Sequence, residues 1–262
     1  MARINIALGM TQYWQRYARV TIASILLNAS SKDEYHFYIM SDSFSQDDKR
    51  NFIKLSIIKD AEFEFLEMNN ADFEGAIHDW LGVSSSYRLK LSSLTDLDKV
   101  LYLDSDLIVL KDINELYSTD VSNYYLAAVA DKMSFLMRNR IAGMNAEYPF
   151  INGGVQLMNL ANFRKDNLED LIFEKLRSND KYTDQDVIND ICHKKTLSLP
   201  LKYNLMLAEG NIYKDRKEEL LEARKAPVII HYTHKPWIDR GTEFADYWLR
   251  YNQYLKDYID KF

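Results

Sequence analysis

Asp104 and Asp106 are the residues of this sequence best placed to do chemistry. They stand one residue apart between two apolar runs, residues 100–103 and 107–110, which predict strands buried on both faces. Two carboxylates at the end of a buried strand repel each other unless a cation lies between them, and a divalent metal ion is the simplest such cation. The alternative is a capped turn in which Asp106 only satisfies backbone N–H groups.

Paired glycines mark a second candidate site. Gly153 and Gly154 interrupt the apolar run 149–160, which indicates either a strand bulge or a place where another group approaches the backbone closely. Asn152, directly before them, could hydrogen-bond a ligand hydroxyl or could cap a turn.

A third candidate site lies late in the chain. His231 stands near the end of the apolar run 226–232, and His234, Lys235 and Trp237 follow at once. A lone histidine at a strand end is usually structural. Two histidines, a lysine and a tryptophan gathered where an α/β sheet places its ligands favour a binding role instead.

Two further stretches carry charges whose use the sequence leaves open. Residues 87–91 predict a helix with Arg88 and Lys90 on different faces, so one of these cations could reach the same crevice. The alternative is a solvated helix with one cation paired to a neighbour. Thr183 is expected to cap a helix that Asp186 supports, which needs no chemistry.

The elements that must position these residues alternate between strand and helix. This order predicts an α/β fold with a mostly parallel, Rossmann-like sheet, helices on both faces, and a ligand at the carboxyl ends of the strands. The expected strands are 4–8, 35–40, 62–66 and 125–130, and the expected helices are 18–29, 45–58 and 161–177.

Composition and net charge exclude some classes of binding partner and indicate a compartment. The chain has 262 residues and a net charge of −6, which offers no basic face to nucleic acid. The only cysteine, Cys192, fits a reducing compartment, and neither a membrane span nor a signal peptide is apparent. We therefore expect a cytoplasmic protein.

The last segment, residues 243–262, predicts a strongly amphipathic helix. Its apolar face is expected to pack across the domain. The alternatives are contact with a second copy of the chain or peripheral contact with the inner face of the membrane.

Taken together, three separated pieces of the sequence resemble glycosyltransferase family 8. They are Asp104-Ser105-Asp106, then Asn152-Gly153-Gly154 with Asp184-Gln185-Asp186, then His231-Tyr232 with Lys235-Pro236-Trp237. The similarity runs from residue 4 to about residue 240. It implies a GT-A fold and a retaining transferase that uses a nucleotide sugar, usually UDP-linked, with Mn²⁺ or alternatively Mg²⁺.

The resemblance also implies domain limits. A GT-A domain is expected over residues 1–240, with a nucleotide-binding half at 1–115 and a sugar and acceptor half at 116–240. Residues 241–262 would form the separate C-terminal helix.

The resemblance assigns roles to single residues. Asp104, Asp106 and His231 match the metal ligands, and Gln185 matches the residue beneath the reacting carbon. A glutamine amide is a poor nucleophile, so we expect a front-face mechanism, with Asp184 as the nucleophile if a covalent intermediate forms. The residues expected to bind the donor are Thr11, Tyr13, Arg88, Asp104, Ser105, Asn152, Gly153, Asp184 and Lys235.

Two stretches depart from the family pattern. The first loop of the family usually contains an acid, whereas residues 10–14 here read Met-Thr-Gln-Tyr-Trp. Thr11 or Gln12 could still hydrogen-bond a base, and Trp14 could stack on it. The loop between His231 and Lys235 is also shorter than usual, so Lys235 could approach the phosphates at a different angle, or His234 could take its place.

The leading hypothesis is transfer of a hexose from UDP-glucose or UDP-galactose to a cell-surface glycan, lipopolysaccharide or glycoprotein. One alternative is a catalytically silent, donor-binding partner of an active transferase. A nucleotidyltransferase is the other, although no glycine-rich, basic phosphate loop follows the first strand.

Overall fold

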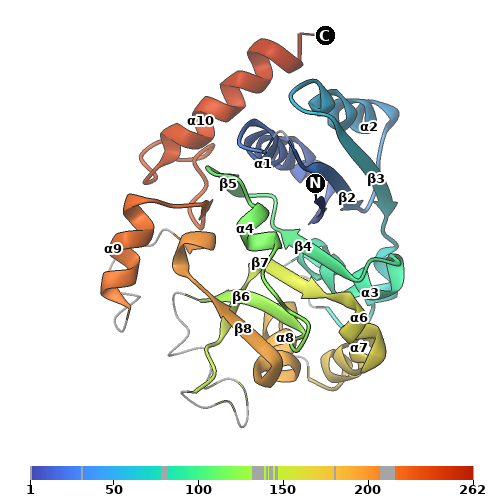
Figure 1. Ribbon diagram of the computed structural model, residues 1–262. Coiled ribbons are helices and arrows are strands. Elements are labelled where there is room, and N and C mark those ends of the chain that lie inside the picture. Colours follow the sequence, from blue (N-terminus) through green and yellow to red (C-terminus); the bar gives the residue numbers. More distant parts are fainter. Residues whose placement is uncertain are drawn as a thin grey trace.

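The computed structural model describes residues 2–30, 32–77, 82–131, 139, 141, 144, 147–179, 181–206 and 216–261. At its centre is a seven-stranded sheet in the order β3-β2-β1-β4-β7-β6-β8 (Figure 1). Its strands are β1 Arg3–Met10, β2 Glu34–Ser41, β3 Ala61–Glu67, β4 Lys99–Leu103, β6 Leu126–Ala130, β7 Ile151–Asn159 and β8 Thr196–Leu199.

The large sheet is mostly parallel, as the alternation of elements predicts. The pairs β1–β2, β2–β3, β1–β4 and β6–β8 are parallel, whereas β7 is antiparallel to both β4 and β6. Parallel pairing needs long crossovers, and helices supply most of them here. The reversed strand β7 carries the paired glycines.

A second sheet forms beside the first and holds the late histidine. It contains β5 Leu107–Val109, β9 Leu205–Met206 and β10 Ile229–His231, in the order β5-β10-β9. β5 follows β4 after a short turn, so residues 104–106 join the two sheets. β10 runs antiparallel to β5 and places His231 opposite Leu107.

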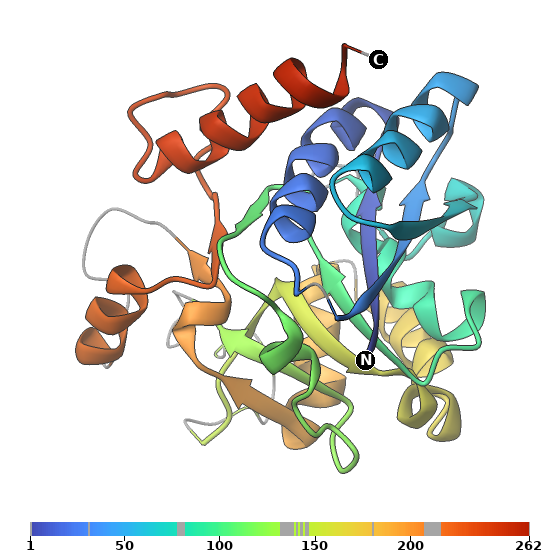
Figure 2. The same cartoon turned by 45° about the horizontal axis from the view of Figure 1, so that its top comes forward.

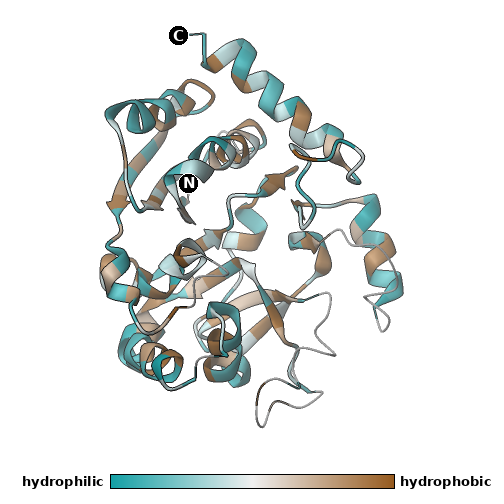
Figure 3. Cartoon of the chain, turned by 180° about the vertical axis from the view of Figure 1, so that it is seen from behind, coloured by the Kyte–Doolittle hydropathy of each residue, from teal (hydrophilic) through white to brown (hydrophobic). Residues whose placement is uncertain are grey.

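Helices cover both faces of the large sheet, each over its own hydrophobic cluster. One face carries α1 Gln15–Leu27, α2 Gln46–Ile53 and α10 Ala245–Tyr254, and the other carries α3 Leu91–Leu94, α6 Leu160–Lys165, α7 Leu168–Ser178 and α8 Asp184–Cys192. The remaining described α-helices are α4 Asn114–Tyr117 and α9 Lys217–Lys225. Figure 3 shows hydrophobic and hydrophilic residues alternating along the helices, as expected when one side faces a sheet.

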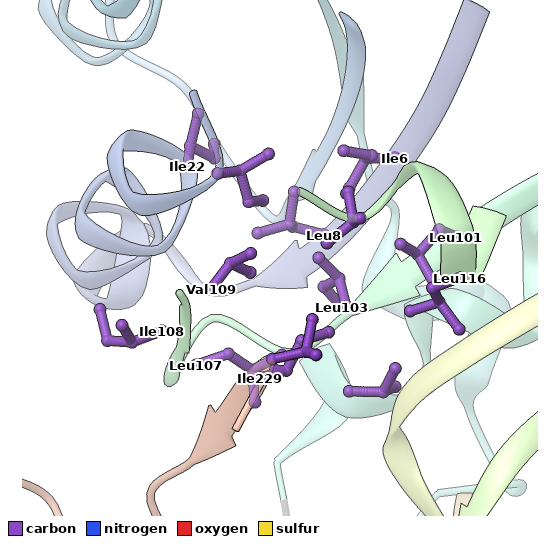
Figure 4. Packing of buried hydrophobic residues seen from close by; sticks show 14 of the residues in the cluster. Ile6, Leu8, Ile22, Leu101, Leu103, Leu107, Ile108, Val109, Leu116 and Ile229 are labelled. Carbon is purple, nitrogen blue, oxygen red and sulfur yellow. The ribbon is translucent and has the colours of Figure 1, made fainter. Parts of the chain in front are cut away.

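The strands that flank the acidic turn are rooted in this core. Leu103 precedes the turn and Leu107 follows it, and both side chains are fully buried. Figure 4 shows them near Leu8 of β1 and Ile229 of β10. Packing on both sides therefore leaves the turn itself little freedom to move.

Two of the expected helices are interrupted. The helix expected over 45–58 ends at Ile53 and continues as a 3₁₀ segment, Lys54–Ile57. The helix expected over 161–177 is two helices, because Asn167 adopts a left-handed conformation with φ 51° between them. Asparagine tolerates this conformation better than most residues.

The C-terminal helix packs on the domain, as its amphipathic pattern predicts. α10 lies beside α1 in both views (Figures 1 and 2) and buries Trp248, while the turn that follows it buries Leu255 and Ile259. Tyr258 was expected on the same face, but it is 59% exposed because the last turn, Leu255–Ile259, has π-helical geometry. Residue 262 lies outside the described residues.

Within the described part of the chain, no helix has both the length and the apolar character of a membrane span. The division into halves at residue 115 and the separation of the C-terminal helix at residue 240 stay predictions.

Candidate active site

The acidic pair lies in the turn between β4 and β5. The N–H of Asp104 donates to the carbonyl of Gly154 on β7 over 2.9 Å, and the carbonyl of Asp106 accepts from the N–H of Tyr232 over 3.2 Å. The start of the turn is thus tied to the large sheet and its end to β10. Both carboxylates are held at the edge where the carboxyl ends of β1 and β4 meet.

The pairing of β5 with β10 brings His231 to the same place. Its Nε2 atom lies 3.3 Å from Oδ1 of Asp106 and 3.8 Å from Oδ2 of Asp104. One ligand atom from each of the three side chains lies within 4.8 Å of the others. Two carboxylates and an imidazole at this spacing could hold a single divalent ion.

One oxygen of this cluster lacks a partner that most buried oxygens have. Oδ1 of Asp106 is buried and accepts no hydrogen bond. Buried carboxylate oxygens are otherwise almost always satisfied by a donor or a cation. An unsatisfied oxygen that faces a second carboxylate and an imidazole fits a metal-binding site better than a capped turn.

Lys235 supplies a positive charge on the other side of Asp106. Its Nζ atom forms an ion pair with Oδ2 of Asp106 and donates to the carbonyl of Tyr232 over 2.7 Å. Burial opposes ionisation of Asp106, but His231 and Lys235 together outweigh it and hold the pKa of this carboxyl well below its ordinary value. Asp106 is therefore an anion at neutral pH.

Asp104 has the opposite balance. Burial raises the pKa of its carboxyl, because the opposing charge of Arg88 compensates only in part and Asp106 adds repulsion. The two acids of the turn are thus electrostatically unequal, although only one residue separates them.

Arg88 is a buried cation between the two halves of the site. It lies in the 3₁₀ segment Val83–Lys90 and is only 3% exposed. Its guanidinium forms an ion pair with Asp184, lies 3.4 Å from Asp104 and donates to the carbonyl of Gly153 over 2.9 Å. Burial disfavours its charged form, but the pair with Asp184 outweighs this and raises the pKa of Arg88.

The alternative interpretation of residues 87–91 as a solvated helix is therefore wrong for Arg88. The segment is a 3₁₀ helix that leads into α3, and Arg88 points to the interior. Lys90 is the cation that pairs with a neighbour, since its Nζ atom lies 3.5 Å from Glu169.

The paired glycines allow this close approach. A Cβ atom on Gly153 would lie 2.5 Å from Nη2 of Arg88, and a Cβ atom on Gly154 would lie 2.8 Å from Oδ2 of Asp104. The β6–β7 register also shifts at this point, between Ala128 and Ala130. The interpretation of the glycines as a place of close approach is confirmed, and the register shift shows that the ladder is irregular there.

Asn152 and Gln185 form a polar network beside the glycines. Oε1 of Gln185 accepts from the N–H of Gly153 over 2.9 Å, and its Nε2 lies 3.5 Å from Asp131. The Nδ2 of Asn152 donates to the same aspartate over 3.2 Å. Gln185 belongs to the first turn of α8, whose N-cap Thr183 forms the predicted capping box with Asp186.

A pocket of about 390 Å³ opens beside the acidic turn. This volume lies within the range of small-molecule sites, roughly 300–1,000 Å³. Its lining residues are Gly9, Met10, Trp14, Ser84, Ser85, Asp104, Ser105, Asp106 and Lys235. The first loop, the 3₁₀ segment and the acidic turn thus share one cavity at the expected edge of the sheet.

Comparison with known sequences identifies the family of this chain. The sequence model described as "Glycosyl transferase family 8" matches residues 5–241. The chain belongs to glycosyltransferase family 8.

Relatives and solved structures agree with this family 8 assignment. A putative glycosyltransferase of Haemophilus influenzae is 27% identical over 87% of this chain and 71% of its own length. A lipopolysaccharide 1,2-glucosyltransferase of Escherichia coli is 28% identical over 90% of this chain and 73% of its own length.

Among solved structures, the apo WbbM bifunctional glycosyltransferase matches with a TM-score of 0.82 and 21% identity, over 95% of this chain and 49% of that one. The galactosyltransferase LgtC, in complex with donor and acceptor sugar analogues, matches with a TM-score of 0.79 and 23% identity, over 97% and 96% of the two chains. The expected GT-A fold is confirmed, and so is the expected enzyme class, a retaining hexosyltransferase.

The first loop of this family 8 enzyme contributes Met10 and Trp14 to the wall of the pocket. Thr11 and Tyr13 stay predicted donor contacts beside this wall. Tyr13 is 63% exposed, and Arg16 lies over its ring at 4.5 Å. Trp14 packs edge-on against Trp237, with ring centres 5.6 Å apart.

Sequence reasoning missed one residue of the family 8 site altogether. Asn204 is fully buried between His231 and Asn152 and hydrogen-bonds both of them. An amide directly before the apolar pair Leu205-Met206 is the only signal that it left in the sequence.

Proposed function

We propose that this family 8 enzyme uses Mn²⁺ to transfer a hexose from UDP-glucose or UDP-galactose to a cell-surface glycan, lipopolysaccharide or glycoprotein. The observation that carries the proposal is the convergence of Asp104 and Asp106, from one turn, with His231, from the end of β10, beside a pocket that both acids line together with Lys235. The likeness to a lipopolysaccharide 1,2-glucosyltransferase supports the class of acceptor.

Asp104, Asp106 and His231 would hold the ion. An imidazole beside two carboxylates favours Mn²⁺ over Mg²⁺, which prefers oxygen ligands and retains its waters. When bound, the ion neutralises the charge that grows on the departing diphosphate. Ionised Asp106 is ready for this role at neutral pH, whereas burial raises the pKa of Asp104 above its ordinary value and makes its negative charge costlier.

The pocket walls suit a nucleoside diphosphate. Trp14 presents a ring whose position is fixed by Trp237, and an aromatic ring in a pocket can stack on a nucleobase. Nζ of Lys235 lies 5.8 Å from the centre of that ring, so the pocket combines an aromatic surface with a cation that could pair with a phosphate. Thr11, Tyr13 and Ser105 remain predicted donor contacts around this wall.

The network around β7 would hold the transferred sugar. Asn152, Gly153 and Asp184 line its polar side, and Asp184 is 5% exposed and ion-paired with Arg88. A carboxylate neutralised by a buried arginine is a weak nucleophile, which supports a front-face mechanism over a covalent intermediate. Gln185 then stabilises the positive charge that develops at the reacting carbon through its carbonyl oxygen.

Calorimetry tests the proposal directly. Wild-type protein is titrated with UDP-glucose and UDP-galactose, with and without Mn²⁺, and release of UDP is then followed with a panel of glycan acceptors. We expect tight binding only with the metal. No metal-dependent binding of any nucleotide sugar would contradict the proposal.

A matched pair of variants sharpens the same experiment. Asp106→Ala removes a metal ligand and should abolish the effect of Mn²⁺ on donor binding. Asp98→Ala removes an acid of another Asp-x-Asp triplet, which is exposed and pairs with Arg164, and should change nothing.

A further inference from the structure

Asn204 contacts the ring nitrogen of His231 that faces away from the acids. Its Oδ1 atom lies 3.0 Å from Nδ1 of His231, while Nε2 of the imidazole faces Asp106 and Asp104. His231 is 7% exposed and Asn204 is fully buried. Among the described residues, the polar neighbours that these contacts give the imidazole are the amide of Asn204 and the carboxylates of Asp104 and Asp106.

The orientation of the Asn204 amide is determined by the backbone N–H of Gly154, which acts through the side chain of Asn152. The N–H of Gly154 donates to Asn152 over 3.0 Å, and a backbone N–H can only donate, so the atom that it meets is the oxygen of the Asn152 amide. The other end of that amide faces the carboxylate of Asp131, which only accepts when ionised, so it must be the nitrogen.

The orientation of Asn152 in turn determines which atom of Asn204 faces the imidazole of His231. The oxygen of Asn152 also accepts from Asn204 over 2.9 Å, so Nδ2 of Asn204 faces Asn152 and Oδ1 faces His231. An amide oxygen has no proton to give. Nδ1 of His231 must therefore carry the proton, which leaves a lone pair on Nε2 in the neutral ring.

We propose that Asn204 is a positioning residue that fixes the tautomer of His231, so that Nε2 presents its lone pair to Asp104 and Asp106. The metal role of that lone pair rests on the proposed function, but the tautomer itself does not. Without this amide, a neutral histidine next to an ionised carboxylate would instead place its proton on Nε2 and donate to Asp106. In the neutral ring, Asn204 therefore keeps the proton on Nδ1 rather than on the nitrogen that faces the acids.

The same amide chain reaches the sugar side of the site. Because the oxygen of Asn152 is shared between Gly154 and Asn204, its nitrogen is left to face Asp131 and Gln185. The backbone N–H of Gly154 thus sets the donor and acceptor pattern on both sides. Loss of such an outer contact to a metal-bound histidine typically weakens metal binding by about 10–100-fold.

Nuclear magnetic resonance of the metal-free wild-type protein tests the inference first. The ring nitrogens of ¹⁵N-labelled histidine are observed at a pH where the ring is neutral, and His231 is assigned by its absence from the spectrum of a His231→Gln variant. We expect the proton on Nδ1. A proton on Nε2 in the metal-free protein overturns the inference, whatever the metal experiments show.

Binding of Mn²⁺ alone, measured by calorimetry, tests the consequence. Asn204→Leu keeps the size of the side chain and removes the acceptor, so we expect about 10–100-fold weaker binding than in wild type. Asn5→Leu removes a remote amide that donates to Tyr117 and should bind Mn²⁺ like wild type. Equal affinity of Asn204→Leu and wild type would overturn the inference, whereas a wild-type protein that binds no Mn²⁺ would contradict the proposed function instead.

Discussion

Gly154 leaves no room for a side chain beside His231. A Cβ atom at this position would lie 2.8 Å from Nδ1 of the imidazole, closer than real Cβ contacts allow. The backbone of β7 therefore forms one wall of the acidic site, and the position of His231 depends on the absence of a single methyl group.

Gly154→Ala should weaken Mn²⁺ binding by at least about 10-fold, because the new methyl group pushes the imidazole away from the acids. The crowding should also cost about 1–3 kcal/mol of unfolding free energy. Calorimetry and urea denaturation measure the two effects. Gly241→Ala is the control, since Gly241 is exposed and its nearest neighbour is the flexible Asp239 side chain. Unchanged Mn²⁺ affinity in Gly154→Ala would contradict the geometry.

Arg88→Met should destabilise the protein by about 3–5 kcal/mol, because it leaves Asp184 buried without its cation. Urea denaturation measures this cost. The double variant Arg88→Met with Asp184→Leu should recover a large part of it, since the buried carboxylate of Asp184 is then removed with its cation. Arg50→Met breaks an exposed pair with Asp47 and should cost less than about 1 kcal/mol. A double variant as unstable as the single one would argue against a buried pair.

Lys235→Met should have opposite effects on two ligands. Mn²⁺ alone should bind several-fold more tightly, because Lys235 no longer competes for Asp106. UDP in the presence of Mn²⁺ should bind about 10-fold more weakly, because a charged contact to the diphosphate is lost. Calorimetry with each ligand separates the two effects, and Lys225→Met, at an exposed pair with Glu222, is the control. Weaker binding of both ligands would show that Lys235 only supports the fold.

Gln185→Ala should leave donor binding nearly unchanged and lower turnover by about 10²-fold, because its carbonyl acts on the charge of the transition state rather than on the ground state. Steady-state kinetics and calorimetry give the two numbers. Gln253→Ala, at an exposed contact with Asp257, serves as the matched variant. Turnover equal to wild type would remove Gln185 from the mechanism.

Cys192 should be inert in the folded protein. Burial raises the pKa of its thiol to about 12, so almost no thiolate exists at pH 8. A thiol reagent should therefore react at pH 8 only after unfolding in urea. The pKa of the Cys192 thiol is higher in the folded protein than in the unfolded chain. The contribution of this thiol to the free energy of unfolding is therefore complete below about pH 8.5 and falls as the pH rises towards about 12. Cys192→Ala should lose this alkaline part of the pH dependence, and rapid labelling of native protein would contradict the burial.

The acidic turn could be predicted from the sequence because all its determinants are local. Apolar runs on both sides of Asp104 and Asp106 specify buried strands, and the carboxyl ends of such strands meet at one edge of a sheet. His231 could be predicted near a strand end, but it reaches the acids through the antiparallel pairing of β10 with β5 in the second sheet. The capping box of Thr183 and Asp186 depends on residues three positions apart, so it could also be predicted from the sequence.

The interior pairing of the site could not be predicted in this way. The partner of Arg88 is 96 positions away, and the 3₁₀ segment that carries it has no periodicity that points the side chain inward. Asn204 joins two residues from distant strands, so its role depends on the packing of both sheets. In the first loop, Met10 and Trp14 line the pocket, and Trp14 also packs on Trp237, a contact between distant residues that no local pattern predicts.

The late position of β10 in the sequence has a consequence for biosynthesis. Asp106 and Lys235 are 129 positions apart, so the acids leave the ribosome long before the strand that completes their surroundings. At translation speeds of about 5–20 residues per second, the emerging turn stays without its imidazole and ammonium neighbours for several seconds. Throughout that interval the nascent polypeptide holds the acids without their cationic neighbours, and the cluster is completed only after residues 231–235 have been synthesised.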